Sequence, residues 1–149
     1  MVGGGIAGCE AARVAAMRGH RVVLLEQGKR LGGQLLIAAR APGRDSFEDQ
    51  AYFEENELAR LGVEVRLQSC ADVAAIRALS PDAVVIATGA LPRVPEDVPG
   101  IELPHVMQGW DVMLGKASTG DRVAVIAQED YYQTPAVAEY LASRGKQVE

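Results

Sequence analysis

A glycine pattern close to the N-terminus restricts the fold of this chain more than any other feature. Gly3, Gly5 and Gly8 form the spacing G-x-G-x-x-G, and the following residues have the pattern of a helix. An apolar segment, Arg21–Glu26, comes next and ends in an acidic residue. A glycine turn, a helix and an acidic strand end at this spacing form the fingerprint of a β-α-β unit that binds a dinucleotide.

Each residue of this fingerprint has a physical role. Gly3 permits the tight turn, Gly5 lets the backbone approach a pyrophosphate, and Gly8 lets the helix pack closely on the strand. The helix N-terminus offers N–H groups and partial positive charge to the phosphates. Glu26 is expected to accept hydrogen bonds from the ribose hydroxyls and to repel a 2′-phosphate, which disfavours NADP. The alternative is a glycine-rich turn without a ligand.

Short apolar runs alternate with helical patterns along the chain, which is typical of a parallel α/β sheet. Buried strands are predicted at Arg21–Glu26, Ala83–Ala87 and Arg122–Ala127, and a half-exposed strand at Val63–Leu67. Helices are predicted at Gly8–Arg18, Asp45–Arg60, Gln108–Leu114 and Ala136–Ser143. The apolar face of the second helix is expected to contain Phe47, Ala51, Phe53, Leu58 and Leu61. We therefore predict a three-layer, Rossmann-like α/β fold with a parallel sheet.

The composition changes after residue 90, where Pro92, Pro95, Pro99 and Pro104 fall close together. We expect a dinucleotide-binding half at 1–92, a connector at 93–120 and the start of a second, similar unit at 121–149. Only two residues precede the glycine pattern, and the last residues resemble the start of a strand. We therefore expect the chain to be a fragment of a larger protein.

Two further motifs point to the same ligand. Arg30–Leu35 contains a double glycine that allows a loop to fold back over a pyrophosphate, and Gly33 and Gln34 lie in it. Ala87–Thr88–Gly89 follows an apolar run, and ligands of open α/β sheets bind at such strand ends. Taken separately, each motif is equally compatible with an ordinary turn.

Composition excludes several other functions. The net charge is −5 and the basic residues are scattered, which does not favour nucleic-acid binding. Cys9 and Cys70 are far apart and neither belongs to a C-x-x-C motif, so we expect no metal site and no redox pair. There is no apolar run long enough for a membrane span and no export signal, so we expect a cytoplasmic protein. No pattern of catalytic side chains is present, and catalysis would depend on the cofactor.

Four segments together resemble one family: V-G-G-G-I-A-G, L-L-E-Q-G-K-R-L-G-G-Q-L, A-P-G-R-D-S-F and D-A-V-V-I-A-T-G-A-L-P-R-V-P. They are similar to the C-terminal nucleotide-binding region of the NADH:flavin oxidoreductases, which include 2,4-dienoyl-CoA reductase and the trimethylamine and dimethylamine dehydrogenases. The resemblance implies a parent enzyme with an upstream FMN-bearing barrel and a 4Fe-4S cluster. It implies FAD, or ADP in its place, as the ligand of this chain, and an electron-carrier protein as partner.

The resemblance also assigns residues to the cofactor. Those expected at the pyrophosphate are Gly3, Gly5, Ala7 and Gly8. Those expected at the adenosine ribose are Glu26 and Gln27. Those expected along the cofactor loop and beside the cofactor are Gly33, Gln34, Ala87, Thr88 and Gly89.

One segment departs from the reductases of that family. Where they carry a second glycine fingerprint for NADPH, this chain has residues 128–135, Q-E-D-Y-Y-Q-T-P, without a glycine. We therefore expect no reduction by NADPH through this region, and we expect Tyr131 and Tyr132 to pack over the turn. Pro135 is expected in the first turn of the following helix.

We conclude from the sequence that the chain is a nucleotide-binding module of a flavin-dependent oxidoreductase and is inactive by itself. Two alternatives stay open: a structural module that binds ADP without a redox role, and a part of an NAD(P)H-dependent flavoprotein reductase.

Overall fold

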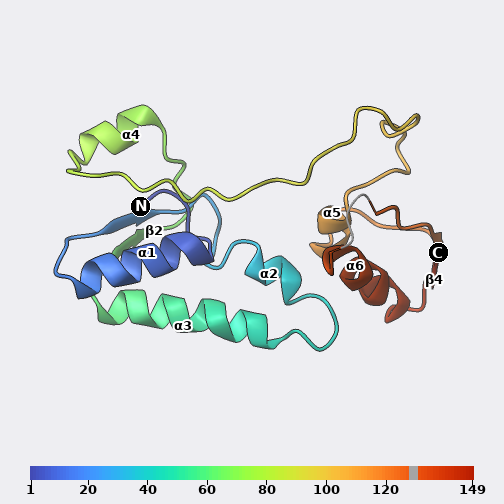
Figure 1. Ribbon diagram of the computed structural model, residues 1–149, viewed down its shortest axis with the longest axis horizontal. Helices are drawn as coiled ribbons and strands as arrows, with labels where there is room; N and C mark the ends of the chain where they lie inside the picture. The colour runs from blue at the N-terminus through green and yellow to red at the C-terminus, as the bar shows by residue number, and fades with distance from the viewer. Residues whose placement is uncertain (128–130) are drawn as a thin grey trace. The chain divides into compact units, whose positions relative to one another are not determined.

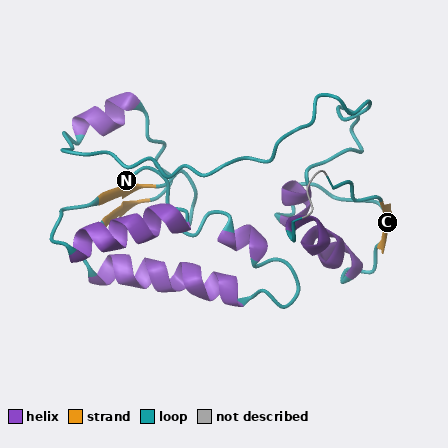
Figure 2. Ribbon diagram, in the orientation of Figure 1, coloured by secondary structure: helices purple, strands orange, loops and turns teal. Residues whose placement is uncertain are grey.

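A computed structural model describes residues 1–127 and 131–149 and divides the chain into two compact units (Figure 1). Unit 1 comprises Met1–Leu36 and Ser46–Gly89. Unit 2 comprises Ile37–Asp45 and Ala90–Glu149. Helices and short parallel strands alternate in both units, as Figure 2 shows.

Unit 1 contains the glycine fingerprint. Its elements are α1 (Ile6–Met17), β1 (Val23–Leu25), α3 (Ser46–Arg60), β2 (Glu64–Arg66) and α4 (Val73–Ala78), and α2 (Leu35–Ala38) begins in it. Strands β1 and β2 are parallel, with Val23 opposite Glu64. Val2 adds parallel bridges to Leu25 on one side and to Ile86 on the other. The lateral order is therefore β2, β1, Val2 and the segment around Ile86, which is the order of the first half of a doubly wound sheet.

The core of unit 1 lies between these strands and the pair α1 and α3, which run side by side (Figure 1). Small residues on α1 allow this close packing, since Cys9 and Ala12 are fully buried. The buried residues of this core are Cys9, Ala12, Val22, Leu24, Leu31, Leu58 and Val63. The glycine turn is consequently held at the end of a packed helix, next to the sheet.

Unit 2 is built around a second β-α-β arrangement. Its elements are α5 (Gly109–Met113), β3 (Arg122–Val123), α6 (Gln133–Ala142) and β4 (Gln147–Val148). Strands β3 and β4 are parallel, with Val123 opposite Val148. The buried residues of the core are Ala41, Val112, Met113, Ala136, Tyr140 and Leu141. Gly145, which follows α6, has a φ of +77° and ends the helix as glycine commonly does.

The structure confirms the predicted parallel pairing and the positions of the four predicted helices, within a few residues at their ends. Two short helices, α2 and α4, were not predicted. The signal for α4 was Asp72, whose carboxylate accepts a hydrogen bond of 2.7 Å from the Ala75 N–H and caps the helix.

The prediction of a buried strand at Ala83–Ala87 was wrong. Ile86 is 75% exposed, Val84 is 43% exposed, and the segment pairs only with Val2 among the described residues. The predicted strand Arg122–Ala127 is also shorter, since only Arg122–Val123 is strand. An apolar run predicts strand tendency, but its burial depends on a covering layer, and the described residues place none over this side of the segment.

The predicted apolar face of α3 was partly wrong as well. Phe53 is 49% exposed, whereas Glu54 is only 3% exposed. The buried positions are Ala51, Glu54 and Leu58, which are spaced three and four residues apart and so lie on one helical face. Helix geometry therefore places a carboxylate where the hydrophobic pattern predicted an aromatic side chain.

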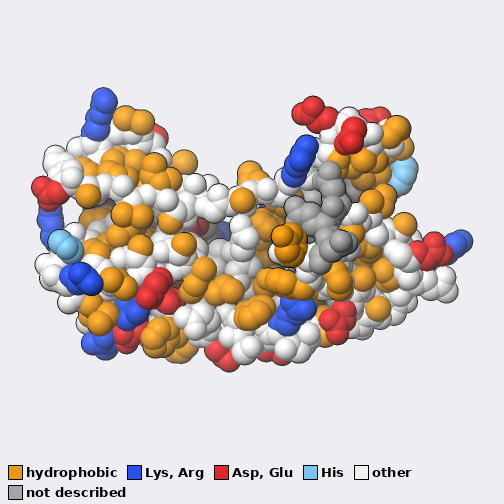
Figure 3. Space-filling model, in the orientation of Figure 1, with side chains coloured by type: hydrophobic (Ala, Val, Ile, Leu, Met, Phe, Trp, Pro, Cys, Tyr) orange, Lys and Arg blue, Asp and Glu red, His pale blue; other side chains and the backbone are white. Residues whose placement is uncertain are grey.

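Basic and acidic side chains are intermixed on the face shown in Figure 3. Within the described residues, no helix is long and apolar enough to span a bilayer.

Candidate functional site

The glycine turn leads directly into α1 and leaves the start of that helix without a side-chain cap. Gly5 is the N-cap, and no side chain of the described residues caps the helix there. The first intrahelical bond runs from Cys9 N–H to Gly5 O at 2.9 Å. The N–H groups of Ile6, Ala7 and Gly8 precede that bond and so have no partner within the helix. These donors, together with the helix dipole, suit an anion.

Gly3 and Gly8 are required by the packing of the protein itself. A Cβ on Gly3, whose φ is +101°, would collide with the carbonyl oxygen of Ala87. A Cβ on Gly8 would collide with the carbonyl oxygen of Gly3 and would lie 3.3 Å from the Ala87 side chain. The first and third predicted motifs are therefore in direct contact, with Thr88 following Ala87 beside the turn.

Gly5 differs from these two glycines. Its φ of −70° and ψ of 175° suit any residue, and a Cβ built on it would meet no described atom within 4 Å. The described protein therefore gives no reason for a glycine at this position. A ligand that must approach the backbone closely would give one, because a Cβ would fill the space beside the helix start.

The double-glycine loop lies directly on the glycine turn. Gly32 N–H donates to Gly4 O at 2.8 Å, and Gly5 and Gly32 form a parallel bridge. A Cβ on Gly33, whose φ is +53°, would lie 2.9 Å from the Cα of Gly5. The next residue, Gln34, brings its Nε2 to 3.5 Å from the position a Cβ on Gly89 would take. All three motifs therefore meet around one turn.

The Glu26 carboxylate is fixed by two backbone donors. Oε2 accepts from Gly4 N–H at 2.6 Å and Oε1 accepts from Gly28 N–H at 2.5 Å. A carboxylate can accept about four hydrogen bonds, so capacity remains for ribose hydroxyls. Glu26 is half-buried at the end of β1, and Gln27 beside it is exposed. The predicted ribose-binding side chain thus lies on the glycine turn.

Sequence reasoning missed the residues that support this arrangement through their backbones. Gly4 is buried and uses its N–H for Glu26 and its carbonyl for Gly32. A Cβ on Gly4 would lie 2.5 Å from the side chain of Leu31. The middle glycine of G-G-G, and Gly28 two residues after Glu26, were the available signals.

Cys9 serves the same turn from inside the core. Its thiol is fully buried and donates to Gly4 O at 3.3 Å. Burial raises the pKa of the Cys9 thiol to about 12, and the nearby Glu54 carboxylate adds to the shift. The neutral thiol is therefore the stable form, and Cys9 packs as a small side chain. Among the described residues, no cluster of His, Cys, Asp or Glu could hold a metal ion.

The segment that departs from the reductase pattern is described in part. Gln128, Glu129 and Asp130 lie outside the described residues. Tyr131 and Tyr132 are both more than half exposed. Within unit 2, the Arg44 guanidinium lies 4.7 Å from the centre of the Tyr132 ring, a cation–π contact.

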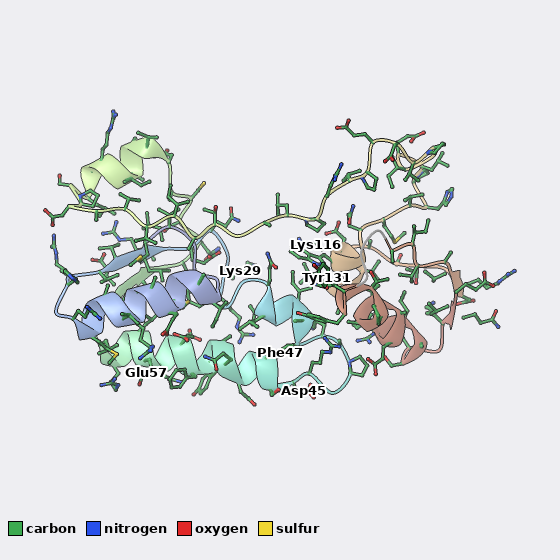
Figure 4. The ribbon with its side chains drawn as sticks, viewed as in Figure 1. Lys29, Asp45, Phe47, Glu57, Lys116 and Tyr131 are labelled. Carbon is green, nitrogen blue, oxygen red and sulfur yellow. The ribbon has the colours of Figure 1, made fainter. Side chains whose placement is uncertain are left out.

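The start of α6 agrees with the sequence. Pro135 lies in the first turn of α6, as predicted. Tyr131, at the start of this region, is labelled in Figure 4.

Comparison with curated proteins identifies long relatives. The chain is 42% identical to N,N-dimethylglycine/sarcosine dehydrogenase of Chromohalobacter salexigens, over 100% of this chain and 22% of the relative. It is 43% identical to an NADH oxidase of Thermoanaerobacter brockii, over 99% of this chain and 23% of the relative. The chain thus spans less than a quarter of the length of these relatives.

Solved structures also match nearly the whole of this chain, and this chain matches less than a quarter of each of them. The complex of 2-naphthoyl-CoA reductase with 2-naphthoyl-CoA matches with a TM-score of 0.92 and 33% identity, over 99% of this chain and 22% of that one. The 6-hydroxypseudooxynicotine amine oxidase of Pseudomonas geniculata matches with a TM-score of 0.85 and 32% identity, over 97% of this chain and 23% of that one.

The family model described as pyridine nucleotide-disulphide oxidoreductase matches residues 1–138. This match covers the glycine turn, the double-glycine loop and the segment that ends at Gly89. The chain therefore belongs to the pyridine nucleotide-disulphide oxidoreductase family, as a Rossmann-like nucleotide-binding module of its flavin-dependent oxidoreductases.

Proposed function

We propose that this chain binds the ADP half of FAD at the glycine turn, within a larger flavin-dependent oxidoreductase. The observation that carries the proposal is Gly5. Neither its backbone conformation nor any described neighbour requires glycine there, and the space beside it adjoins the uncapped start of α1. A pyrophosphate fits both the space and the donors.

The residues proposed to hold the cofactor surround this turn. Backbone at Gly3, Gly5, Ala7 and Gly8 would bind the pyrophosphate. The Glu26 carboxylate, oriented by its two backbone donors, would accept from the ribose, with Gln27 beside it. The remaining proposed contacts are Gly33, Gln34, Ala87, Thr88 and Gly89.

The flavin would supply the electron transfer, and this chain would supply binding and orientation. The relatives are named as a dehydrogenase and an oxidase, which fits a redox role for the whole protein. We propose that the parent protein carries an upstream FMN barrel and a 4Fe-4S cluster, and that it exchanges electrons with a carrier protein. The three-layer architecture, the division at residues 92 and 120, and the cytoplasmic location stay predictions.

Extraction of bound nucleotide from the full-length protein tests the proposal. We expect denatured protein to release stoichiometric FAD, identified by chromatography and absorbance, in addition to FMN. Release of ADP with FMN but no FAD would favour the structural ADP-binding module instead. If no adenine nucleotide is released, and none binds on titration, the proposal is wrong.

Replacement of Glu26 by Gln is expected to weaken ADP binding by about tenfold to a hundredfold. The reason is that a hydrogen bond to a charged group contributes about 1.5–3 kcal/mol. The glutamine amide has one NH₂ group in place of a carboxylate oxygen, so one of the two backbone N–H groups that now donate to Glu26 would face another donor. Calorimetric titration of the full-length protein, freed of nucleotide, with ADP measures the change.

Glu48→Gln is the matched control for this experiment. The Glu48 carboxylate is exposed and pairs with Arg30 at 2.7 Å, and among the described residues it forms no hydrogen bond or ion pair with the glycine turn. We expect it to bind ADP as the wild type does. Equal affinity of Glu26→Gln and the wild type would remove Glu26 from the site.

A further inference from the structure

A buried carboxylate lies between α3 and the helix that begins at the glycine turn. Glu54 is 3% exposed and occupies the face of α3 between Ala51 and Leu58. Its Oε1 accepts from Gln50 Nε2 at 3.1 Å. Its Oε2 is buried and has no hydrogen-bond partner among the described residues. A charged form of such a group is costly, because the single hydrogen bond from Gln50 compensates only part of the charge.

The charged groups around Glu54 do not neutralise it. On α1, Arg13 is the nearby cation, but its Nε and Nη2 donate to Glu10 at 2.7 and 2.8 Å. On α3 itself, Glu57, labelled in Figure 4, pairs with Arg60 at 2.8 Å. Within the described part of the chain, no ion pair includes Glu54.

The direction of titration follows from these surroundings. Burial raises the pKa of Glu54, and Glu10 and Glu57 raise it further. The Gln50 hydrogen bond and Arg13 lower it, but by less. The neutral carboxyl is therefore favoured to a higher pH than for an ordinary glutamate.

The face of α3 that contains Glu54 packs against the glycine turn. The Cβ of Ala51, about one helical turn before Glu54, lies 2.7 Å from the position that a Cβ on Gly32 would take, and Gly32 N–H donates to Gly4 O. Cys9 lies in the first turn of α1, and Glu54 is the largest electrostatic contributor to the raised pKa of its thiol. The same turn presents the N–H groups proposed to bind the pyrophosphate. An ionised Glu54 therefore adds negative potential where the phosphates would bind, whereas the neutral form does not.

We propose that Glu54 couples nucleotide binding at the start of α1 to uptake of a proton. The inference rests on the proposed function, since it concerns the same turn. The pyrophosphate and an ionised Glu54 repel each other, so the bound nucleotide favours the neutral carboxyl. By reciprocity, affinity for the nucleotide is highest at pH values where Glu54 is already neutral and falls as Glu54 ionises.

Calorimetric titration of the nucleotide-free, full-length protein with ADP tests the coupling, in two buffers of different ionisation enthalpy. We expect net uptake of up to one proton per ADP, and affinity that falls about five- to tenfold as the pH rises through the titration of Glu54. Glu54→Gln should bind ADP with the proton uptake lost. Glu64→Gln, which changes an exposed carboxylate on β2 that pairs with Arg66, should retain it.

The outcomes separate the two proposals. If ADP binds to the wild type without proton uptake, or if Glu54→Gln keeps the full uptake, the coupling is wrong and the nucleotide site stands. If ADP does not bind to the wild type at any pH, the proposed function is wrong, and the proposed coupling is then wrong as well. Where Glu54→Gln does not fold, Glu54→Leu removes the same titrating group in an apolar form.

A measurement without nucleotide completes the test. A raised pKa in the folded state means that stability is lost as Glu54 ionises with rising pH. The unfolding temperature of the wild type should therefore fall relative to that of Glu54→Gln as the pH rises above about 4.3, the pKa of an unperturbed glutamate. Parallel curves for the two proteins would show that Glu54 does not titrate in this range and would overturn the coupling.

Discussion

Replacement of Gly5 by Ala is expected to weaken ADP binding at least a hundredfold and to leave the fold intact. The backbone of Gly5 already has dihedral angles that alanine adopts, and a Cβ there meets no described atom within 4 Å. Alanine is a poorer N-cap than glycine, which costs about 1 kcal/mol at most. In the complex, however, the Cβ would occupy the space proposed for the pyrophosphate. Loss of two charge-assisted hydrogen bonds, each about 1.5–3 kcal/mol, corresponds to a hundredfold or more.

Gly120→Ala is the matched control. Gly120 also lacks a positive φ and has open space at its Cβ position, and it lies outside the glycine turn. Calorimetry with ADP and thermal unfolding of both full-length variants separate binding from stability. We expect Gly120→Ala to resemble the wild type in both measurements. Wild-type affinity in Gly5→Ala would mean that no pyrophosphate approaches Gly5, and the nucleotide site would have to be sought elsewhere.

The sequence was sufficient to predict that three distant motifs meet around one turn. Gly3 has a φ of +101° and Gly8 is fixed by a collision with the carbonyl oxygen of Gly3, and such local steric rules are visible as glycine spacing. The parallel pairing of β1 and β2 followed from the alternation of strands and helices. What the sequence predicted well was therefore local geometry and its order along the chain.

Burial was less predictable, because it depends on what covers a segment. The run that contains Ile86 is as apolar as a buried strand, yet Ile86 is mostly exposed. Glu54 shows the opposite case, since the close packing of α1 and α3 buries a carboxylate that the hydrophobic pattern placed outside the core. The donors that orient Glu26 are backbone N–H groups. Nearly every residue type has such a group, so the sequence does not indicate which ones donate to Glu26.

Gly8→Ala is expected to disrupt the turn itself, unlike Gly5→Ala. A Cβ on Gly8 would collide with the carbonyl oxygen of Gly3. That carbonyl cannot move aside easily, because Gly3 is packed against Ala87 and its N–H donates to Leu25 O at 2.9 Å. To avoid the collision, α1 would have to move away from the strands that it covers. Overpacking of this kind costs about 3 kcal/mol or more.

Thermal unfolding and calorimetry on the same two variants distinguish the roles of these glycines. For Gly8→Ala we expect an unfolding temperature lower by about 10 °C or more, with loss of ADP binding as a consequence. For Gly5→Ala we expect loss of binding at nearly unchanged unfolding temperature. If Gly8→Ala unfolds at the wild-type temperature, α1 must be able to shift on the sheet, and the close packing assigned to Gly8 would not be what requires glycine there. If both variants lose stability equally, the turn acts as one structural unit, and the open space beside Gly5 would no longer argue for a ligand.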